Sequence, residues 1–356
     1  MKRLTHFLGI CCLILAFIWH PKTNGELRFG KDILFILLAS VSFLSFGVKR
    51  SLPIALLILY SGQIDIYSGH ALFQLAMVIF GLILFAQVYS IGIKSDIFEN
   101  YLLALGIIQA LWFIGNYFNF SPQHYIDMII GPSGRQYVYS NGAWVLSTLV
   151  KQPVVGSLGQ HTISAIYFIL ALPMAIKRIW PLAIIIPALF ICNSTMVQLS
   201  CIICAISYYV KNTKILLLPL TMSISLFLVN LKYNYSEWLS GQGRVPVWLW
   251  SIKNTKLFGN GLGHLSDSMP SFGGEVFQQV HNEYLELVYV YGLIIVPMLC
   301  YVIFKVVNSK HSLLKCSLIG LLFNASGNFS FHISAIAIIG IILIAENLRD
   351  EREFLL

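Results

Sequence analysis

Long apolar runs constrain this chain more than any other feature of its sequence. A helix of about 20 apolar residues crosses the roughly 30 Å hydrocarbon core of a bilayer, and runs near that length recur along the whole chain. Hydrophobic residues make up 57% of the 356 residues and charged residues only 11%, against about 25% charged in soluble domains. Because so few charges cannot cover a soluble surface, we expect a polytopic membrane protein.

The lengths of these runs and the breaks between them predict an all-α fold, a bundle of about twelve transmembrane helices. A single membrane domain, 1–356, is expected to include two long loops, 119–160 and 232–282. Long loops in compact proteins are usually functional or disordered, and these carry Trp, Tyr, Gly and Pro, so we expect ordered loops. The predicted spans are 4–19, 33–48, 51–64, 70–91, 100–118, 161–176, 179–193, 194–210, 215–231, 283–304, 314–327 and 332–346.

Basic residues predict the orientation of these spans. Lys and Arg collect in the cytoplasmic segments of membrane proteins, and here they collect in alternate segments that begin with Lys2 and Arg3. The even number of spans then places both termini in the cytoplasm and both long loops outside. Segment 20–32 is an exception, because it carries three cations on the outer side. Short basic loops explain the net charge of +8, so we expect a lipid bilayer, and no nucleic acid, as the partner.

The second long loop gathers cations and tryptophans. Arg244 follows the ninth span, and its guanidinium either holds a phosphate in a bidentate fork or snorkels toward lipid headgroups. Lys253 and Lys256 add positive charge nearby. Trp248 is either an anchor at the membrane interface or a stacking platform for a sugar. The Gly-Asn-Gly-Leu-Gly turn at 259–263 can offer backbone N–H groups to an anion.

Four polar residues open the tenth span: His281, Asn282, Glu283 and Glu286. Histidine is the usual general base near neutral pH, and a glutamate can also serve. His281 and Glu286 are five residues apart and do not share a helical face, so a partner that orients His281 must come from elsewhere. The alternative is a polar helix start, in which Asn282 caps the helix and the glutamates complement its dipole.

The first long loop holds the remaining polar candidates. Lys151, Gln160 and His161 lie beside the sixth span, and Arg135 lies within a Gly-Pro-Ser-Gly-Arg-Gln turn. The place of His161 favours an interfacial polar residue over a ligand. The nine histidines have no metal-ligand spacing, so we expect neither a metal nor a cofactor.

Three segments carry a combined pattern. The first is Arg-x3-Trp at 244–248, followed by Leu-Phe-Gly-Asn-Gly-Leu-Gly; the second is H-N-E-Y-L-E-L-V-Y-V-Y-G-L-I from His281; the third is G-S-L-G-Q-H-T-I-S-A with a later A-L-P. Together they resemble the bacterial O-antigen ligase and O-antigen polymerase family, which also contains protein O-oligosaccharyltransferases. The resemblance covers roughly residues 150–300.

This resemblance implies a metal-independent glycosyltransferase of the bacterial inner membrane, acting in lipopolysaccharide or other polysaccharide biosynthesis. Such an enzyme moves glycan from an undecaprenyl-diphosphate carrier to a hydroxyl of a glycan, a lipid A-core or a protein on the periplasmic face. Arg244 matches the family arginine that holds the diphosphate, and His281 matches the histidine that activates the acceptor. The chain departs from the family pattern at 193–196, where the family's cation is missing. Lys151 and Arg135 are candidates to supply that second phosphate-binding group.

A transporter of lipid-linked glycan or of a small solute is the alternative function. Twelve spans suit a transporter, but ion-coupled carriers usually hold Asp, Glu or Lys near the middle of the bilayer. The predicted spans have almost none, and their polar groups collect at the outer ends. This distribution favours transfer chemistry that faces outward, and it leaves ligase and polymerase activity equally open.

Overall fold

The computed structural model describes most of the predicted helical segments and the residues beside them. The described residues are 1–17, 69–118, 120, 137–140, 143–146, 161–192, 194–210, 245–261, 265, 268–271, 280–310, 312–328 and 334–350. Three predicted spans, 33–48, 51–64 and 215–231, lie outside the described residues.

Every predicted span that falls on described residues is helical, so the expected helical fold is confirmed for this part of the chain. The strands described there form one short antiparallel hairpin, β1 (Tyr137–Ser140) and β2 (Ala143–Leu146), within the first long loop. The helices are α1 (Lys2–Phe17), α4 (Gly69–Ile91), α5 (Ser95–Tyr117), α7 (His161–Ser164), α8 (Ile166–Arg178), α9 (Leu182–Ile191), α10 (Thr195–Tyr209), α13 (Val245–Lys253), α15 (Glu283–Tyr291), the 3₁₀ helix η3 (Leu293–Ile295), α16 (Val296–Asn308), α17 (Leu313–Ala325) and α18 (Ser334–Asp350).

The predicted span 283–304 is not one continuous helix. It is broken at Gly292, whose φ of 87° and ψ of 175° lie in a region that only glycine occupies readily. The 3₁₀ helix η3 follows, and Pro297 then stands in the first turn of α16, where its missing N–H costs no helical hydrogen bond. The apolar run continues through this break, which is why it read as a single helix.

Length and composition identify one candidate membrane crossing among the described helices. Helix α5, with 23 residues, is long and apolar enough to span a bilayer. Shorter apolar helices of 10–17 residues accompany it, including α9, α10 and α17. A helix of this kind also occurs in the core of soluble proteins, and 44% of the apolar window of α5 is buried inside the bundle.

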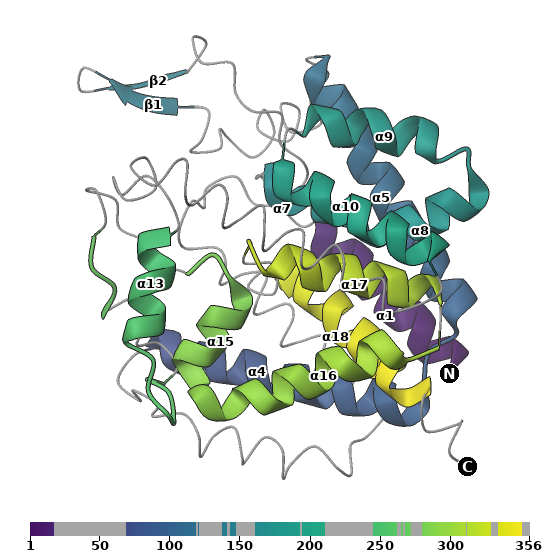
Figure 1. Ribbon diagram of the computed structural model, residues 1–356. Coiled ribbons are helices and arrows are strands. Elements are labelled where there is room, and N and C mark those ends of the chain that lie inside the picture. Colours follow the sequence, from purple (N-terminus) through teal and green to yellow (C-terminus); the bar gives the residue numbers. More distant parts are fainter. Residues whose placement is uncertain are drawn as a thin grey trace.

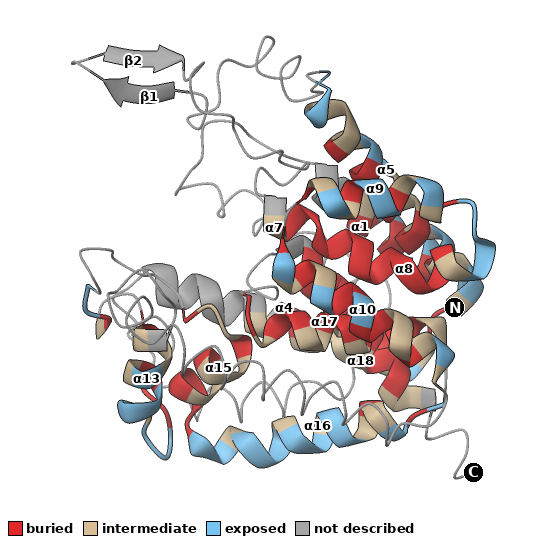
Figure 2. Ribbon diagram, turned by 45° about the horizontal axis from the view of Figure 1, so that its top comes forward, coloured by how far each residue is buried: buried red, intermediate tan, exposed pale blue. Residues whose placement is uncertain are grey.

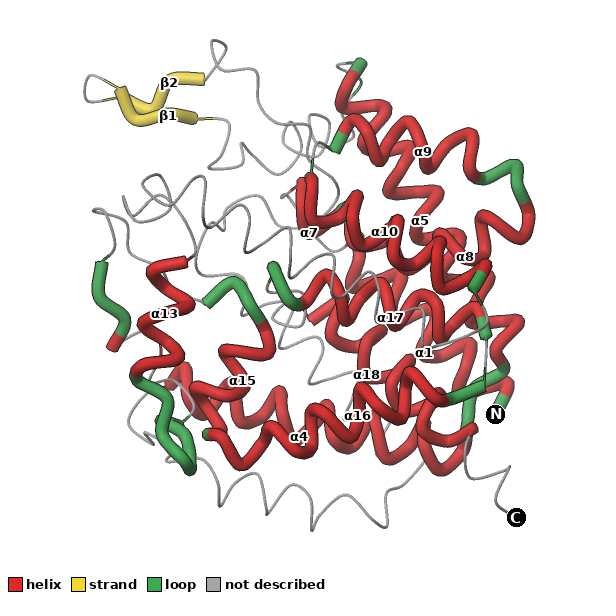
Figure 3. The backbone as a smooth tube through the Cα atoms, in the orientation of Figure 1, coloured by secondary structure: helices red, strands yellow, loops and turns green. Residues whose placement is uncertain are grey.

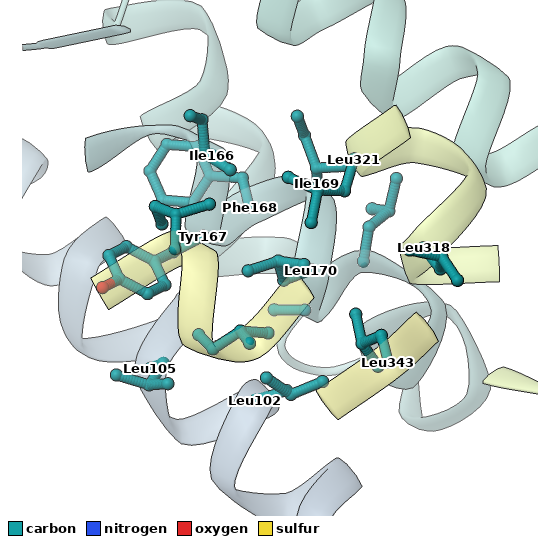
Figure 4. Close-up of a cluster of buried hydrophobic side chains, with 14 of the residues drawn as sticks. Leu102, Leu105, Ile166, Tyr167, Phe168, Ile169, Leu170, Leu318, Leu321 and Leu343 are labelled. Atoms are coloured by element: carbon teal, nitrogen blue, oxygen red, sulfur yellow. The ribbon is translucent and has the colours of Figure 1, made fainter. Parts of the chain in front are cut away.

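Helix α8 runs through the core of the bundle, and each of its residues from Ile166 to Ala175 is buried. It packs beside α5, α10 and α17. Gly106 permits the approach of α5, because a Cβ at this position would lie 2.2 Å from the Ala171 Cβ. Figure 4 shows Tyr167 and Phe168 of α8 among leucines of α5, α17 and α18. The core therefore fixes α17, which contacts α15 of the candidate site.

Hydrogen bonds tie several helix ends together at one end of the bundle, here called the terminal end. The Thr5 Oγ1 at the start of α1 accepts the Lys94 N–H at 2.8 Å, and the Glu346 Oε2 in α18 accepts the Ile93 N–H at 3.1 Å. Ser309 Oγ, after α16, donates to the Asn347 side chain at 3.2 Å. The N-terminus and the end of α18 lie on this side (Figure 1).

The opposite end of the bundle, here called the site end, is where α10 and α15 begin and α17 ends. The Asn324 side-chain amide donates to Ser200 Oγ at 3.1 Å, so a buried polar contact joins α17 to α10. The Tyr284 hydroxyl donates to the Leu322 carbonyl at 2.7 Å and joins α15 to α17. Helix α13 and the β1–β2 hairpin lie on this side in Figure 1. The described parts of both long loops are therefore remote from the N-terminus and from the end of α18.

Helix α16 presents apolar side chains on its outer side. Met298, Tyr301 and Phe304 are 52%, 57% and 63% exposed, and Figure 2 shows α16 exposed along most of its length. The exposed Leu257 and Phe258 lie next to the start of η3, because the Ile294 N–H donates to the Leu257 carbonyl at 3.3 Å. Large exposed apolar patches on a protein surface mark contact with a partner protein or with lipid.

Candidate functional site

Helix α15 begins at the site end with a side-chain cap. The Asn282 Oδ1 accepts the N–H groups of Tyr284 and Leu285, each at 3.1 Å. These are amides that the first helical turn leaves without an intrahelical partner, and asparagine is among the residues that best satisfy them. The helix start that the sequence offers as the alternative reading, with Asn282 as the cap, is therefore present in the structure.

His281 precedes the cap in a left-handed backbone conformation. Its φ is 57°, a value that few residues other than glycine adopt, although histidine does so more often than most. The residue is partly exposed. Strained conformations of this kind persist only where the neighbouring structure fixes them, and they cluster at functional sites.

Val280, the residue before His281, is held by two side chains that are distant from each other in the sequence. The Trp248 Nε1–H of α13 donates to the Val280 carbonyl at 2.8 Å. The Val280 N–H donates to Glu286 Oε2 at 3.2 Å. We call Trp248, Val280 and Glu286 the clamp. The clamp therefore brings Trp248 and Glu286, two predicted site residues, to the residue that precedes His281, a third predicted site residue.

Apolar packing of α13 against α15 supports the clamp. Val247 and Val280 are fully buried in a small cluster that also contains Leu265 and Met269. The rings of Trp250 and Tyr289 stack with centroids 5.3 Å apart. This packing fixes the distance between α13 and α15, and therefore lets Trp248 reach Val280.

The turn after α13 folds back beside the end of α15 (Figure 3). The Asn260 N–H donates to the Tyr289 carbonyl and the Gly261 N–H to the Val290 carbonyl, each at 3.0 Å. The Gly259 N–H donates to the Lys256 carbonyl at 3.2 Å. The prediction that this turn offers its amides to an anion is therefore wrong for these three residues, because two of them cap the C-terminal carbonyls of α15.

Two glycines make that return of the chain possible. A Cβ at Gly259 would lie 2.1 Å from the Val290 carbonyl oxygen, and a Cβ at Gly292 would lie 2.2 Å from the Leu257 carbonyl oxygen. Both glycines have a positive φ, 81° and 87° respectively. The backbone at Gly259 therefore crosses the backbone at Gly292 in close contact, and we call this contact the glycine crossing. It accounts for both the break in the predicted span and the glycine turn.

The predicted cations lie at the edge of this unit or outside the described residues. Lys253 ends α13 and Lys256 follows in the turn; both are exposed. His161 begins α7 at the site end (Figure 1), and the structure describes its backbone but not its side chain. The predicted binding residues outside the described part of the chain are Arg244, Lys151, Arg135 and Gln160.

The two glutamates differ in what the structure shows of their contacts. Glu283 and Glu286 are 5% and 8% exposed, and both stand in the first turn of α15, where the helix dipole favours a carboxylate. Glu286 carries the hydrogen bond to Val280 described above. Within the described residues, no three His, Cys, Asp or Glu side chains gather as metal ligands.

Sequence reasoning missed the residues that support His281. Val280 acts through its backbone N–H and carbonyl, so its side chain gives no hint of the role. Tyr284 acts through its hydroxyl, which donates to the distant Leu322 carbonyl, and its residue type does not reveal that partner. Asn260 stands in the predicted turn, and its side chain donates to the carbonyls of Asn254 and Tyr289 at 3.0 and 3.2 Å. An asparagine between two glycines was the one available signal of such a role.

Comparisons of the chain with family models, with curated proteins and with solved structures find no match.

Proposed function

We propose that this protein is a membrane glycosyltransferase that moves glycan from a polyprenyl-diphosphate carrier to an acceptor hydroxyl at the site end. The placement of His281 carries the proposal. A histidine predicted as the general base stands at a partly exposed position, in a left-handed conformation, between a clamped valine and a helix cap.

The exposed apolar surface supports a place in the membrane. The outer side of α16 and the neighbouring Leu257 and Phe258 would lie against lipid, whereas water would be a poor solvent for them. Membrane-spanning helices would also account for the low share of charged residues. On this view the terminal end faces the cytoplasm and the site end faces the periplasm, as the distribution of Lys and Arg predicts.

The reaction needs a base and a means of neutralising a leaving diphosphate. The acceptor oxygen forms a bond to the anomeric carbon of the donor sugar while the bond from that carbon to the diphosphate oxygen breaks. The hydroxyl proton passes to the neutral imidazole of His281. Arg244 is proposed to hold the diphosphate, with Lys253 and Lys256 adding positive charge near the leaving group.

The resemblance of the Arg-x3-Trp and His-Asn-x-x-Leu segments to the O-antigen ligase and polymerase family supports the same reaction. It also suggests the carrier, undecaprenyl diphosphate, and a glycan, lipid A-core or protein hydroxyl as the acceptor. Ligation and polymerisation share this chemistry and differ in the acceptor.

Replacement of His281 tests the proposal. Purified protein in lipid nanodiscs would be given a glycan on a polyprenyl diphosphate together with an acceptor glycan, and transfer would be measured. His281→Ala and His281→Asn are both expected to lose about 10²–10⁴ in rate, as removal of a general base does, while donor binding persists. His6→Asn, at the terminal end, is the matched histidine control and should transfer at the wild-type rate.

Transfer by His281→Asn at the wild-type rate would contradict the assignment, because asparagine could then replace the histidine as a simple helix-start residue. A protein that transfers no glycan but moves a lipid-linked glycan between leaflets would support the transporter instead.

A further inference from the structure

We infer that Trp248 and Glu286 are positioning residues, which hold His281 in its left-handed conformation by clamping Val280. The inference rests on the proposed role of His281 as general base. It gives Glu286 a task other than proton transfer and gives Trp248 a task other than stacking against a sugar.

The Val280 carbonyl belongs to the peptide group that joins Val280 to His281. The φ angle of His281 is measured against the plane of that peptide. When Trp248 Nε1–H donates to this carbonyl at 2.8 Å, it fixes the plane. Glu286 Oε2 accepts the N–H of the preceding peptide at 3.2 Å, so two successive peptide groups before His281 are held.

Asn282, the residue after His281, is held as well. The Asn282 side chain caps α15 through Tyr284 and Leu285, and the Asn282 carbonyl accepts the Glu286 N–H at 3.0 Å. His281 is therefore a single residue between two anchored stretches, and a φ of 57° is the conformation that connects them. Glu286 contributes to both anchors, through its side chain on one side and its backbone on the other.

The geometry argues against Glu286 as the base itself. Its side chain is 8% exposed, and it turns back to a main-chain N–H six residues earlier instead of toward open solvent. A neutral amide oxygen accepts the same hydrogen bond. Glutamine can therefore do what the clamp requires of Glu286, whereas it cannot take a proton.

Four variants separate positioning from catalysis. Glu286→Gln keeps an acceptor for Val280, and Glu286→Leu removes it while preserving much of the volume. Trp248→Phe keeps an aromatic ring and loses the indole N–H. Trp250→Phe is the matched control on the same helix, because Trp250 stacks on Tyr289 and phenylalanine can still stack.

Transfer kinetics and local hydrogen exchange would be measured for each variant in nanodiscs. We expect Glu286→Gln and Trp250→Phe to resemble the wild type. Glu286→Leu and Trp248→Phe should lower kcat by about 10- to 100-fold with little change in the donor KM, since a misplaced base loses rate without loss of binding. In the same two variants, the amides of residues 280–282 should exchange faster.

Several results would overturn the inference. A Glu286→Gln variant as slow as Glu286→Leu would show that the carboxylate takes part in the chemistry. Equal losses in Trp248→Phe and Trp250→Phe would show that the bulk of the indole matters and not its hydrogen bond. Unchanged amide exchange at residues 280–282 in Glu286→Leu and Trp248→Phe would show that the two hydrogen bonds of the clamp do not hold this segment. If His281→Ala kept full transfer, the proposed base would fail, and the exchange data would still decide whether the clamp holds this segment.

Discussion

At the scale of single residues, the start of α15 contains one contact that a local sequence pattern predicts and one that it does not. The sequence offers a cap at Asn282 as the alternative to a catalytic role, because a capping bond spans two or three residues and leaves a local signature. The bond from Trp248 to Val280 spans 32 residues and ends on a backbone carbonyl. Neither residue type predicts such a contact. The sequence therefore suggests for Trp248 only an anchor at the membrane interface or a platform on which a sugar stacks.

The cap itself gives a testable consequence. Asn282→Ala should destabilise the first turn of α15 by about 1 kcal/mol, which corresponds to roughly fivefold faster amide exchange at residues 284–285 if they exchange by local opening. Asn282→Asp keeps the acceptor oxygens and should behave as the wild type. Asn254→Ala is the control, because the Asn254 side chain is exposed and bonds only a carbonyl four residues back among its described contacts. Equal exchange in Asn282→Ala and Asn254→Ala would contradict the capping role.

At the scale of elements, apolar run length predicted where helices lie but not where one of them breaks. The run continues from Tyr289 through Gly292 to Val296 without a polar residue. A single glycine inside such a run is tolerated in many helices, so nothing local distinguished it. The break becomes necessary only because the chain around Gly259 returns to that point, 33 residues earlier in the sequence, and its backbone occupies the space of a Cβ.

The glycine crossing predicts a sharp difference between glycine substitutions. Gly259→Ala and Gly292→Ala each place a Cβ within 2.2 Å of a carbonyl oxygen at a positive φ, so each should destabilise the protein by more than about 1 kcal/mol. The apparent melting temperature of purified protein and its yield as a monodisperse peak would measure this loss. Gly81→Ala is the control: in α4 the nearest atom is the flexible Ile341 Cδ1 at 3.1 Å. Melting of all three variants at one temperature would contradict the crossing.

At the scale of the whole molecule, a buried ionic contact secures the terminal end. The Arg349 guanidinium donates to Glu346 at 2.6 Å, and the same carboxylate accepts the Ile93 N–H. The Glu346 side chain is 5% exposed. Glu346→Ala would leave a partly buried cation and a buried amide without their acceptor, so it should lower stability by about 2 kcal/mol or more.

Asp96→Ala provides the comparison for that measurement. Asp96 lies 3.5 Å from Lys94 at the same corner, but the two side chains are 67% and 36% exposed. Its removal should cost less than about 1 kcal/mol, as is usual for surface pairs. Thermal unfolding in one detergent would compare the stabilities of the two variants. An Asp96→Ala variant less stable than Glu346→Ala would refute the stabilising role given to the contact between Glu346 and Arg349.

The arrangement of the two ends also makes the orientation in a membrane testable. Ser271, an exposed residue of the second long loop, and Lys2, at the start of α1, belong to opposite sides under the proposed topology. In intact cells, an impermeant maleimide should label Ser271→Cys directly and Lys2→Cys only after permeabilisation. Cys300 is the exposed native cysteine among those described, so Cys300→Ser provides the background. The reverse labelling pattern would overturn both the topology and the outward-facing site.

The separation in sequence between contacting residues has a consequence for how the protein is made on the ribosome. The clamp joins residues 6 and 32 positions apart, and Asn260 meets Tyr289 across 29 positions. The bond from Ile93 to Glu346 spans 253 positions. Local contacts form quickly, whereas contacts between remote residues must wait for the later one to be synthesised. The clamp can therefore form while α17 and α18 are still being translated, before contacts such as the one from Ile93 to Glu346 close the bundle.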